Sequence, residues 1–135
     1  MKNVLYIEDS VINARLMDRI FAKHLPGLAL VIAPDGLSGL RMLESEQPAL
    51  LLLDCHLPDI SGLEVLKSAR LAGNTVPVVV ITADARAELE AQMTAAGAEC
   101  FMTKPFTFEE LLAHIREYTP IDPQQDFEET PCAHA

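Results

Sequence analysis

Several side chains that could bind a cation or a phosphoryl group stand directly after short apolar runs of this sequence. Glu8 and Asp9 end the first apolar run, and Asp54 follows four consecutive leucines. Thr82 and Lys104 end two later runs. If these runs are neighbouring parallel strands, three carboxylates, a hydroxyl and an ammonium group meet at one edge of a sheet. Open parallel sheets place their ligand sites at that edge.

Such a cluster favours magnesium-dependent phosphoryl chemistry. Carboxylates held close together repel one another and raise one another's pKa. Mg²⁺ relieves this repulsion, because it takes oxygen ligands and commonly binds one or two carboxylates plus phosphate oxygens. Asp54 could then serve as both ligand and nucleophile. Lys104 would balance the charge of the transferred group, and Thr82 would donate a hydrogen bond to it, so that positioning and electrostatics would supply most of the catalysis.

The elements that must position these residues follow from an alternation of apolar runs with helical periodicity. We expect strands at residues 4–7, 28–33, 50–53, 76–81 and 99–103, each followed by a helix. This pattern predicts an α/β fold with a five-stranded parallel sheet in the order 2-1-3-4-5, flanked by five helices in a doubly wound, flavodoxin-like arrangement. The four contributing strands are then neighbours.

Helix ends can also be predicted from residue types. The Ala-rich fourth helix is expected over residues 83–96, with Gly97 ending it in a left-handed conformation. The first helix carries apolar residues, among them Ile12 and Leu16, at helical spacing. Capping residues are expected at three helix starts, namely Asp9 or Ser10, Ser61 with Glu64, and Thr107 with Glu110.

Composition limits the class of protein. The chain has 135 residues, enough for one domain, and 50% of them are hydrophobic, enough for a core. With 10 basic and 20 acidic residues and a net charge of -10, it is not expected to bind nucleic acid directly or an anionic membrane surface. Protein partners remain compatible with this charge.

Cysteine usage and the C-terminal segment complete the organisation. The cysteines Cys55, Cys100 and Cys132 are odd in number and form no CxxC pair, which indicates reduced thiols and a cytoplasmic protein. No stretch approaches 18 apolar residues, so no membrane span is expected. Residues 119–135 are acidic, contain prolines and have no Lys or Arg, and we expect a disordered tail or linker.

The order and spacing of these motifs resemble a two-component response regulator receiver domain over residues 1–118. Each motif is weak alone, and their joint order carries the resemblance. The matching residues are Glu8-Asp9, Asp54 with Leu57-Pro58-Asp59 and Gly62, Thr82-Ala83, Phe101, and Lys104-Pro105-Phe106.

The resemblance implies specific roles at the strand ends. Asp54 would accept a phosphoryl group from a phosphohistidine of a sensor histidine kinase or a histidine phosphotransfer protein. Mg²⁺ would be held by Glu8, Asp9, Asp54 and the backbone carbonyl of His56, with Asp9 the more direct ligand. The chain would be no enzyme on other substrates and would catalyse only its own phosphorylation and dephosphorylation.

The resemblance also implies a switch. Lys104 would contact the acyl phosphate, Thr82 would move toward it, and Phe101 would change rotamer. The bond before Pro105 is expected to be cis. His56 and Asp84 occupy variable positions beside the site, and the resemblance implies that such positions would influence how long the phosphoryl group persists.

The expected output is a rearranged face formed by the fourth helix, the fifth strand and the fifth helix. This face would contact an unidentified downstream protein, and it is also a candidate for dimer contacts.

Three other interpretations stay open at this level. A receiver-like scaffold would bind partners without phosphorylation, although the intact acidic, Thr and Lys set argues against it. A flavodoxin-like cofactor enzyme would need a Gly-rich phosphate loop after the first strand, where Glu8 and Asp9 stand instead. Cys55 and His56 could form a thiolate or transition-metal site, but no further Cys or His has ligand spacing.

Overall fold

Five parallel strands form the centre of the structure, a computed structural model that describes residues 2–120. Their order is β2-β1-β3-β4-β5, which confirms the predicted topology. The elements along the chain are β1 (Lys2–Ile7), α1 (Val11–His24), β2 (Leu28–Ala33), α2 (Gly36–Glu46), β3 (Leu50–Leu53), α3 (Gly62–Leu71), β4 (Val78–Thr82), α4 (Ala87–Ala95), β5 (Cys100–Thr103) and α5 (Phe108–Tyr118).

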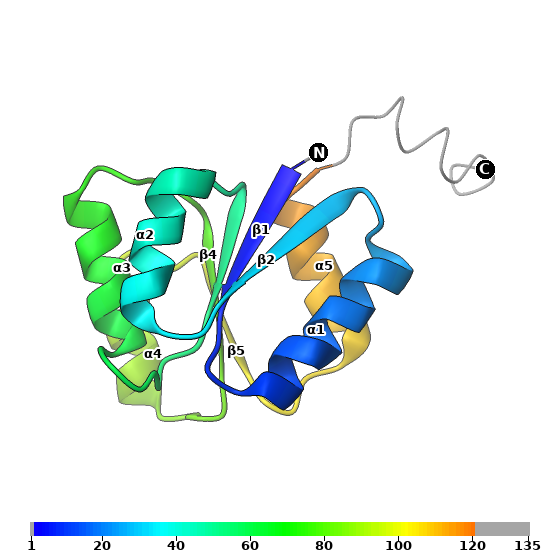
Figure 1. Cartoon of the computed structure of the whole chain (residues 1–135). Helices are drawn as coiled ribbons and strands as arrows, with labels where there is room; N and C mark the ends of the chain where they lie inside the picture. The colour runs from blue at the N-terminus through cyan, green and yellow to red at the C-terminus, as the bar shows by residue number, and fades with distance from the viewer. Residues whose placement is uncertain (1, 121–135) are drawn as a thin grey trace.

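Helices cover both faces of the sheet, with α2, α3 and α4 on one side and α1 and α5 on the other (Figure 1). The four leucines of β3 are completely buried because each face is covered. Along β1, Leu5 and Ile7 pack toward α2 and α3, whereas Val4 and Tyr6 pack toward α1 and α5. The alternation of a strand therefore directs the next residue, Glu8, to the side of Tyr6.

Side-chain oxygens cap three helices where the sequence predicted caps. The hydroxyls of Ser10, Ser61 and Thr107 each accept a hydrogen bond from the backbone N–H three residues further on. Ser10, rather than Asp9, is therefore the cap of α1, and the Asp9 carboxylate is left for the site. These caps satisfy backbone donors that have no partner within the helix.

Helix α4 is shorter than predicted, beginning at Ala87 rather than at residue 83. The Thr82 hydroxyl accepts a hydrogen bond from the Asp84 N–H at 3.2 Å, and the Asp84 carboxylate accepts one from the Arg86 N–H at 3.2 Å. These local acceptors hold residues 83–86 in a non-helical turn. At its other end α4 stops as expected, with Gly97 at φ +110.

The apolar residues that indicated α1 do not all face the core. Met17 and Phe21 are buried, whereas Ile12 is 79% exposed and Leu16 is 57% exposed. Helix α1 packs on the sheet along one stripe only, and the remaining apolar residues of its first turns face solvent.

Two strands begin slightly later than the sequence predicted. Strand β4 begins at Val78 rather than at residue 76, and β5 begins at Cys100 rather than at residue 99.

Thr119, the first residue of the segment expected to be a tail, is part of the folded domain. Thr119 is 1% exposed, and its N–H donates to the Ile115 carbonyl at 2.9 Å, so it forms the C-cap of α5. The rest of the expected tail, beyond Pro120, lies outside the described residues. Within residues 2–120, no helix is both long enough and apolar enough to cross a membrane.

Candidate functional site

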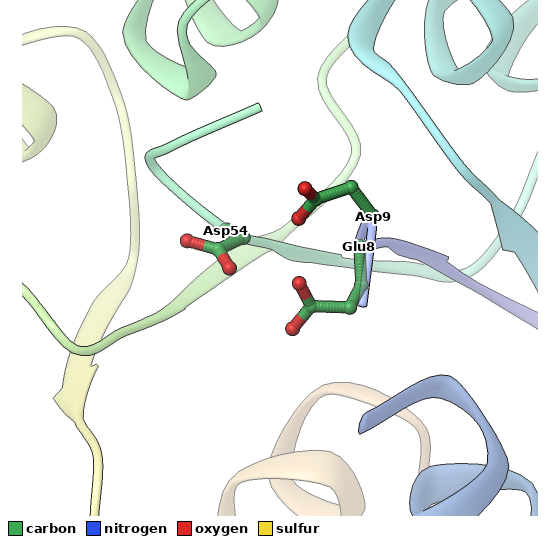
Figure 2. A group of neighbouring side chains, drawn as sticks. All are labelled: Glu8, Asp9 and Asp54. Carbon is green, nitrogen blue, oxygen red and sulfur yellow. The ribbon is translucent and has the colours of Figure 1, made fainter. Parts of the chain in front are cut away.

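The carboxylates of Glu8, Asp9 and Asp54 meet at the C-terminal ends of β1 and β3. One oxygen from each lies within 4.8 Å of the others. Glu8 and Asp9 turn to opposite sides of the β1 end, and Asp54 lies beside them (Figure 2). Glu8 and Asp54 are buried, whereas Asp9 is exposed. Adjacent parallel strands thus bring together acids 45 positions apart in the sequence, as the sequence predicted.

Lys104 reaches this cluster from the end of β5. Its Nζ lies 2.9 Å from Oε1 of Glu8 and 3.7 Å from Oδ2 of Asp54. The Lys104 N–H donates to the Thr82 carbonyl at 2.8 Å, which ties the loop after β5 to the end of β4. The peptide bond between Lys104 and Pro105 is cis. The ammonium group is therefore placed to neutralise two of the three carboxylates.

Glu8 is the centre of a buried polar network, here called the Glu8 network, which consists of Tyr6, Glu8, Asn13 and Lys104. The Tyr6 hydroxyl donates to Oε1 of Glu8 at 2.8 Å, and the Asn13 amide donates to the same oxygen at 3.2 Å. Burial raises the pKa of Glu8, but hydrogen bonds from Lys104 and then Tyr6 outweigh it and hold the pKa at about 2. Glu8 is therefore ionised at neutral pH.

Asp54 lies in a less favourable environment. Burial raises its pKa, and the neighbouring Glu8 adds to the rise, while the His56 N–H and Lys104 offset part of it. The His56 N–H donates to Oδ1 of Asp54 at 3.2 Å. A carboxylate that is buried beside another acid and short of donors gains from binding a cation.

Gly62 allows the start of α3 to pack against the Asp54 loop. Its N–H donates to the Cys55 carbonyl at 2.8 Å. A Cβ atom at this position would lie 2.8 Å from the Cys55 Cα and would also meet the Asp54 backbone. Because backbone atoms cannot move aside easily, this position requires glycine, which explains the glycine that follows the Asp54 loop.

A second polar network, here called the Asp84 network, lies on the loops after β3 and β4 and consists of His56, Asp84 and Arg86. The His56 ring lies 2.8 Å from Asp84 Oδ2, and the Arg86 guanidinium donates to both Asp84 oxygens. Hydrogen bonds from Arg86 and then His56 hold the pKa of Asp84 well below its usual range. The network joins the loop that follows Asp54 to the loop that follows Thr82.

Thr82 and Phe101 occupy the positions proposed for a switch. The Thr82 side chain is buried at the end of β4, where its hydroxyl accepts the Asp84 N–H. Phe101 lies beside Val80 in the β4–β5 pairing and packs partly against the core on the α3 and α4 side. Its role as a rotamer switch stays a prediction, as does the role of the His56 carbonyl as a metal ligand.

The alternative of a reactive thiol next to Asp54 finds no support in the environment of Cys55. Burial raises the pKa of this thiol to about 11, and the charges of Asp54 and Asp84 add to the rise. The nucleophilic and metal-binding form of cysteine is the thiolate. At neutral pH Cys55 is therefore a buried thiol that packs in the core between the sheet and α3.

Four residues with clear roles around the site were not identified as such from the sequence. Tyr6 and Asn13 hold Glu8, Arg86 holds Asp84, and the Asp59 carboxylate accepts the N–H groups of Gly36 and Leu37 at 2.8 Å each. Asp59 thereby fastens the Asp54 loop to the start of α2. Asp59 belongs to the motif that carries the resemblance, although its role was not predicted. Tyr6 also left a usable signal, since it stands two positions before Glu8 on a strand and must share its face.

The acidic cluster fits a hard divalent cation. Its three ligating groups are carboxylate oxygens, which Mg²⁺ and Mn²⁺ prefer over the sulfur and nitrogen ligands of softer metals. Asp9 is exposed and brings the cluster into contact with solvent, which a partly hydrated ion requires. Burial raises the pKa of Asp54 and the neighbouring Glu8 adds to the rise, and a bound cation would favour the ionised form.

Comparisons with known proteins agree with this geometry. The model of the response regulator receiver domain family matches residues 4–116. Response regulator MprA of Mycobacterium ulcerans is 41% identical over 91 residues, which cover 67% of this chain and 39% of that protein. The chain therefore spans well under half the length of this relative.

Solved structures show the same fold at lower identity. A CheY-like response regulator receiver domain protein from Methanospirillum hungatei is 28% identical, with a TM-score of 0.80 over 87% of this chain and 92% of that chain. The Mn²⁺-bound form of response regulator Rcp1 is 26% identical, with a TM-score of 0.73 over 87% and 91% of the two chains. With the family model covering nearly all of the described residues, this chain belongs to the response regulator receiver domain family.

Proposed function

We propose that this receiver domain accepts a phosphoryl group on Asp54 from a phosphohistidine of a sensor histidine kinase or histidine phosphotransfer protein. The observation that carries the proposal is the convergence of three carboxylates within 4.8 Å, with the Lys104 ammonium 2.9 Å from Glu8 and 3.7 Å from Asp54. Acidic ligands for a cation, a carboxylate nucleophile and a counter-charge for a phosphoryl group are thus all at one sheet edge.

Asp9, Asp54, Glu8 and the His56 carbonyl would hold a divalent cation, with Mg²⁺ the expected one. When bound, such an ion supplies charge neutralisation and orientation for the phosphoryl oxygens. The likeness to response regulator Rcp1, whose structure contains Mn²⁺, supports the binding of a divalent cation. Glu8 lies deeper than Asp9 and is already hydrogen-bonded, which supports a more direct role for Asp9.

In the transfer, a carboxylate oxygen of Asp54 attacks the phosphorus atom as the phosphorus–nitrogen bond to the donor histidine breaks. The electron pair of that bond stays on the imidazole nitrogen, and the phosphorus–oxygen bond to Asp54 forms. Lys104 would move from Glu8 toward the new phosphoryl oxygens. Hydrolysis by water would later return Asp54 to its carboxylate. The His56 N–H donates to Asp54 and the His56 ring contacts Asp84, and we expect these two side chains to influence the rate of that step.

The output would come from the face formed by α4, β5 and α5, through contact with an unidentified protein or a second copy of this chain. The start of α4 supports this choice. Among the helices of the described residues, α4 is the one without a side-chain cap at its start. The Thr82 hydroxyl accepts the Asp84 N–H and still has its own O–H to donate to a phosphoryl oxygen. A movement of Thr82 toward a phosphoryl group would therefore shift the loop that leads to the start of α4. A cytoplasmic location stays a prediction.

Mg²⁺-dependent labelling with a small phosphodonor such as acetyl phosphate tests the proposal. We expect the wild-type chain to gain one phosphoryl group only when Mg²⁺ is present, and Asp54→Asn to gain none. Asp18→Asn, which changes an exposed carboxylate on α1 in the same way, is the matched control and should be labelled normally.

Two outcomes would contradict the proposal. Undiminished labelling of Asp54→Asn would exclude Asp54 as the acceptor. A wild-type chain that is not labelled with Mg²⁺ present, by either a small donor or a phosphohistidine protein, would favour a receiver-like scaffold that binds partners without phosphorylation.

A further inference from the structure

Tyr6, two positions before Glu8 on β1, contacts the Glu8 carboxylate but has no role in the proposed chemistry. Tyr6 is 1% exposed and lies on β1 between the sheet and the helices α1 and α5. Its hydroxyl donates to Oε1 of Glu8 at 2.8 Å. A phenylalanine would fill nearly the same volume in this core, so packing alone does not require the hydroxyl. A buried hydroxyl must find a partner, and here the partner is Glu8, one of the proposed metal ligands.

The two oxygens of Glu8 are used very unequally. Oε1 accepts three hydrogen bonds, from Tyr6 at 2.8 Å, Lys104 at 2.9 Å and Asn13 at 3.2 Å. Oε2 accepts one long hydrogen bond, from the Ser10 N–H at 3.4 Å. The capacity that remains for a cation, or for a water bound to it, is therefore on Oε2.

We infer that Tyr6 and Asn13 are positioning residues, which hold Oε1 of Glu8 so that Oε2 is presented to the divalent cation. This inference rests on the proposed function, since it assumes that a cation binds at Glu8, Asp9 and Asp54. Tyr6 approaches from the strand and Asn13 from the first turns of α1, so the carboxylate is held from two elements. Ligands oriented in this way bind metal more tightly than free ones.

The same two donors allow Lys104 to leave. When Lys104 moves to a phosphoryl group, Oε1 of Glu8 loses one of three donors and keeps those of Tyr6 and Asn13. A buried carboxylate that lost its only donor would carry a large desolvation cost, which would hold Lys104 in place. Tyr6 and Asn13 therefore make the exchange of Lys104 between Glu8 and the phosphoryl group easier.

Cation affinity of matched variants tests this inference. We expect Tyr6→Phe to bind Mg²⁺ about tenfold more weakly than the wild-type chain by titration calorimetry, in the range for lost partners of metal ligands. Asn13→Ala should show a smaller loss; Asn13 is only half-buried, so this variant remains informative if Tyr6→Phe does not fold. Tyr118→Phe removes a phenol far from the site and should bind Mg²⁺ normally.

The fluorescence of Tyr6 gives a readout that a purely structural role would not move. The chain has no Trp and two Tyr residues, so Tyr118→Phe leaves Tyr6 as the only strong intrinsic fluorophore. Its emission should change on addition of Mg²⁺ and saturate together with binding, because a cation bound at Glu8 would change the charge around the carboxylate that accepts the Tyr6 hydroxyl. In Tyr6→Phe, the emission of Tyr118 should stay constant.

The outcomes separate this inference from the proposed function. Wild-type affinity for Mg²⁺ in both Tyr6→Phe and Asn13→Ala, or a Tyr6 emission that ignores Mg²⁺, would overturn the positioning role and leave the proposed function intact. Failure of the wild-type chain to bind Mg²⁺ at all would overturn both.

Discussion

The two polar networks that flank Asp54 place a carboxylate against cations and donors in very different surroundings. In the Glu8 network the Glu8 side chain is 1% exposed, and its side-chain donors come from β1, α1 and the loop after β5. In the Asp84 network the partners His56 and Arg86 are 65% and 64% exposed. Both networks lower the pKa of their carboxyl group.

The difference lies in how much free energy each network carries. Buried hydrogen bonds to a charged group are strong, and a charge left there without partners is costly. Exposed ion pairs contribute little, because water and salt screen them. The Glu8 network should therefore determine stability and cation binding, whereas the Asp84 network can change its geometry at little cost. In the proposed function the loop that carries Asp84 would move on phosphorylation, and an exposed network such as the Asp84 network suits such a movement.

The pH dependence of folding should expose the Glu8 network most strongly. Because the pKa of Glu8 is lowered in the folded chain, its ionised form contributes stability above the ordinary value of 4.5, and this is lost as pH falls to about 2. Over that window the wild-type unfolding free energy should fall by roughly 3 kcal/mol more than that of Glu8→Gln. Urea unfolding at a series of pH values measures this, and parallel curves for both chains would contradict it.

Removal of Lys104 should have the next largest effect. Lys104→Ala leaves Glu8 and Asp54 without their shared cation, and we expect a loss of about 2 kcal/mol in the free energy of unfolding without Mg²⁺. Lys67→Ala, at an exposed lysine of α3, is the control and should change stability little. Equal denaturation midpoints for the two variants would contradict this, because the Glu8 network would then contribute no more to stability than an exposed ion pair does.

Asp54→Asn should act in the opposite direction. Burial and Glu8 raise the pKa of Asp54, so its ionised form costs stability as pH rises through the folded-state pKa. Without Mg²⁺, the variant should be more stable than wild type at neutral pH, because an amide at this buried position carries no charge. Thermal unfolding with and without Mg²⁺ checks this, since Mg²⁺ should stabilise the wild-type chain and should have less effect on the variant. A less stable variant would indicate that Asp54 is well satisfied as it stands.

Disruption of the Asp84 network should have the smallest effect on stability. Asp84→Asn weakens the contacts of His56 and Arg86, but these partners are solvent-exposed, and we expect no measurable change in the denaturation midpoint. The lifetime of the phosphoryl group on Asp54 should change instead, which a phosphate-release assay can follow. A clear loss of stability with an unchanged lifetime of the phosphoryl group would show that the Asp84 network serves stability, as the Glu8 network is expected to do.

Much of the site could be predicted because its residues end the strands. Apolar runs that stop at Glu8, Asp54, Thr82 and Lys104 identify strand ends, and a parallel sheet brings such ends to one edge. The start of α4 could not be predicted from periodicity, because the side chains of Thr82 and Asp84 compete for the backbone of residues 83–86. Helical spacing likewise overstated the burial of Ile12 and Leu16 on α1.

The amino-acid sequence by itself determined the strand order, the acidic edge and the family, since these depend on which residue types occur and in what order. Only the tertiary structure decided which of the acids Glu8 and Asp9 is buried in a hydrogen-bond network and which is exposed. Glu8 and Asp9 are neighbours in the sequence, yet the alternation of β1 directs one toward Tyr6 and Asn13 and leaves the other in solvent. The pKa of a carboxyl group and its contribution to stability depend on its burial and its hydrogen-bond donors, and those come from several elements packed together.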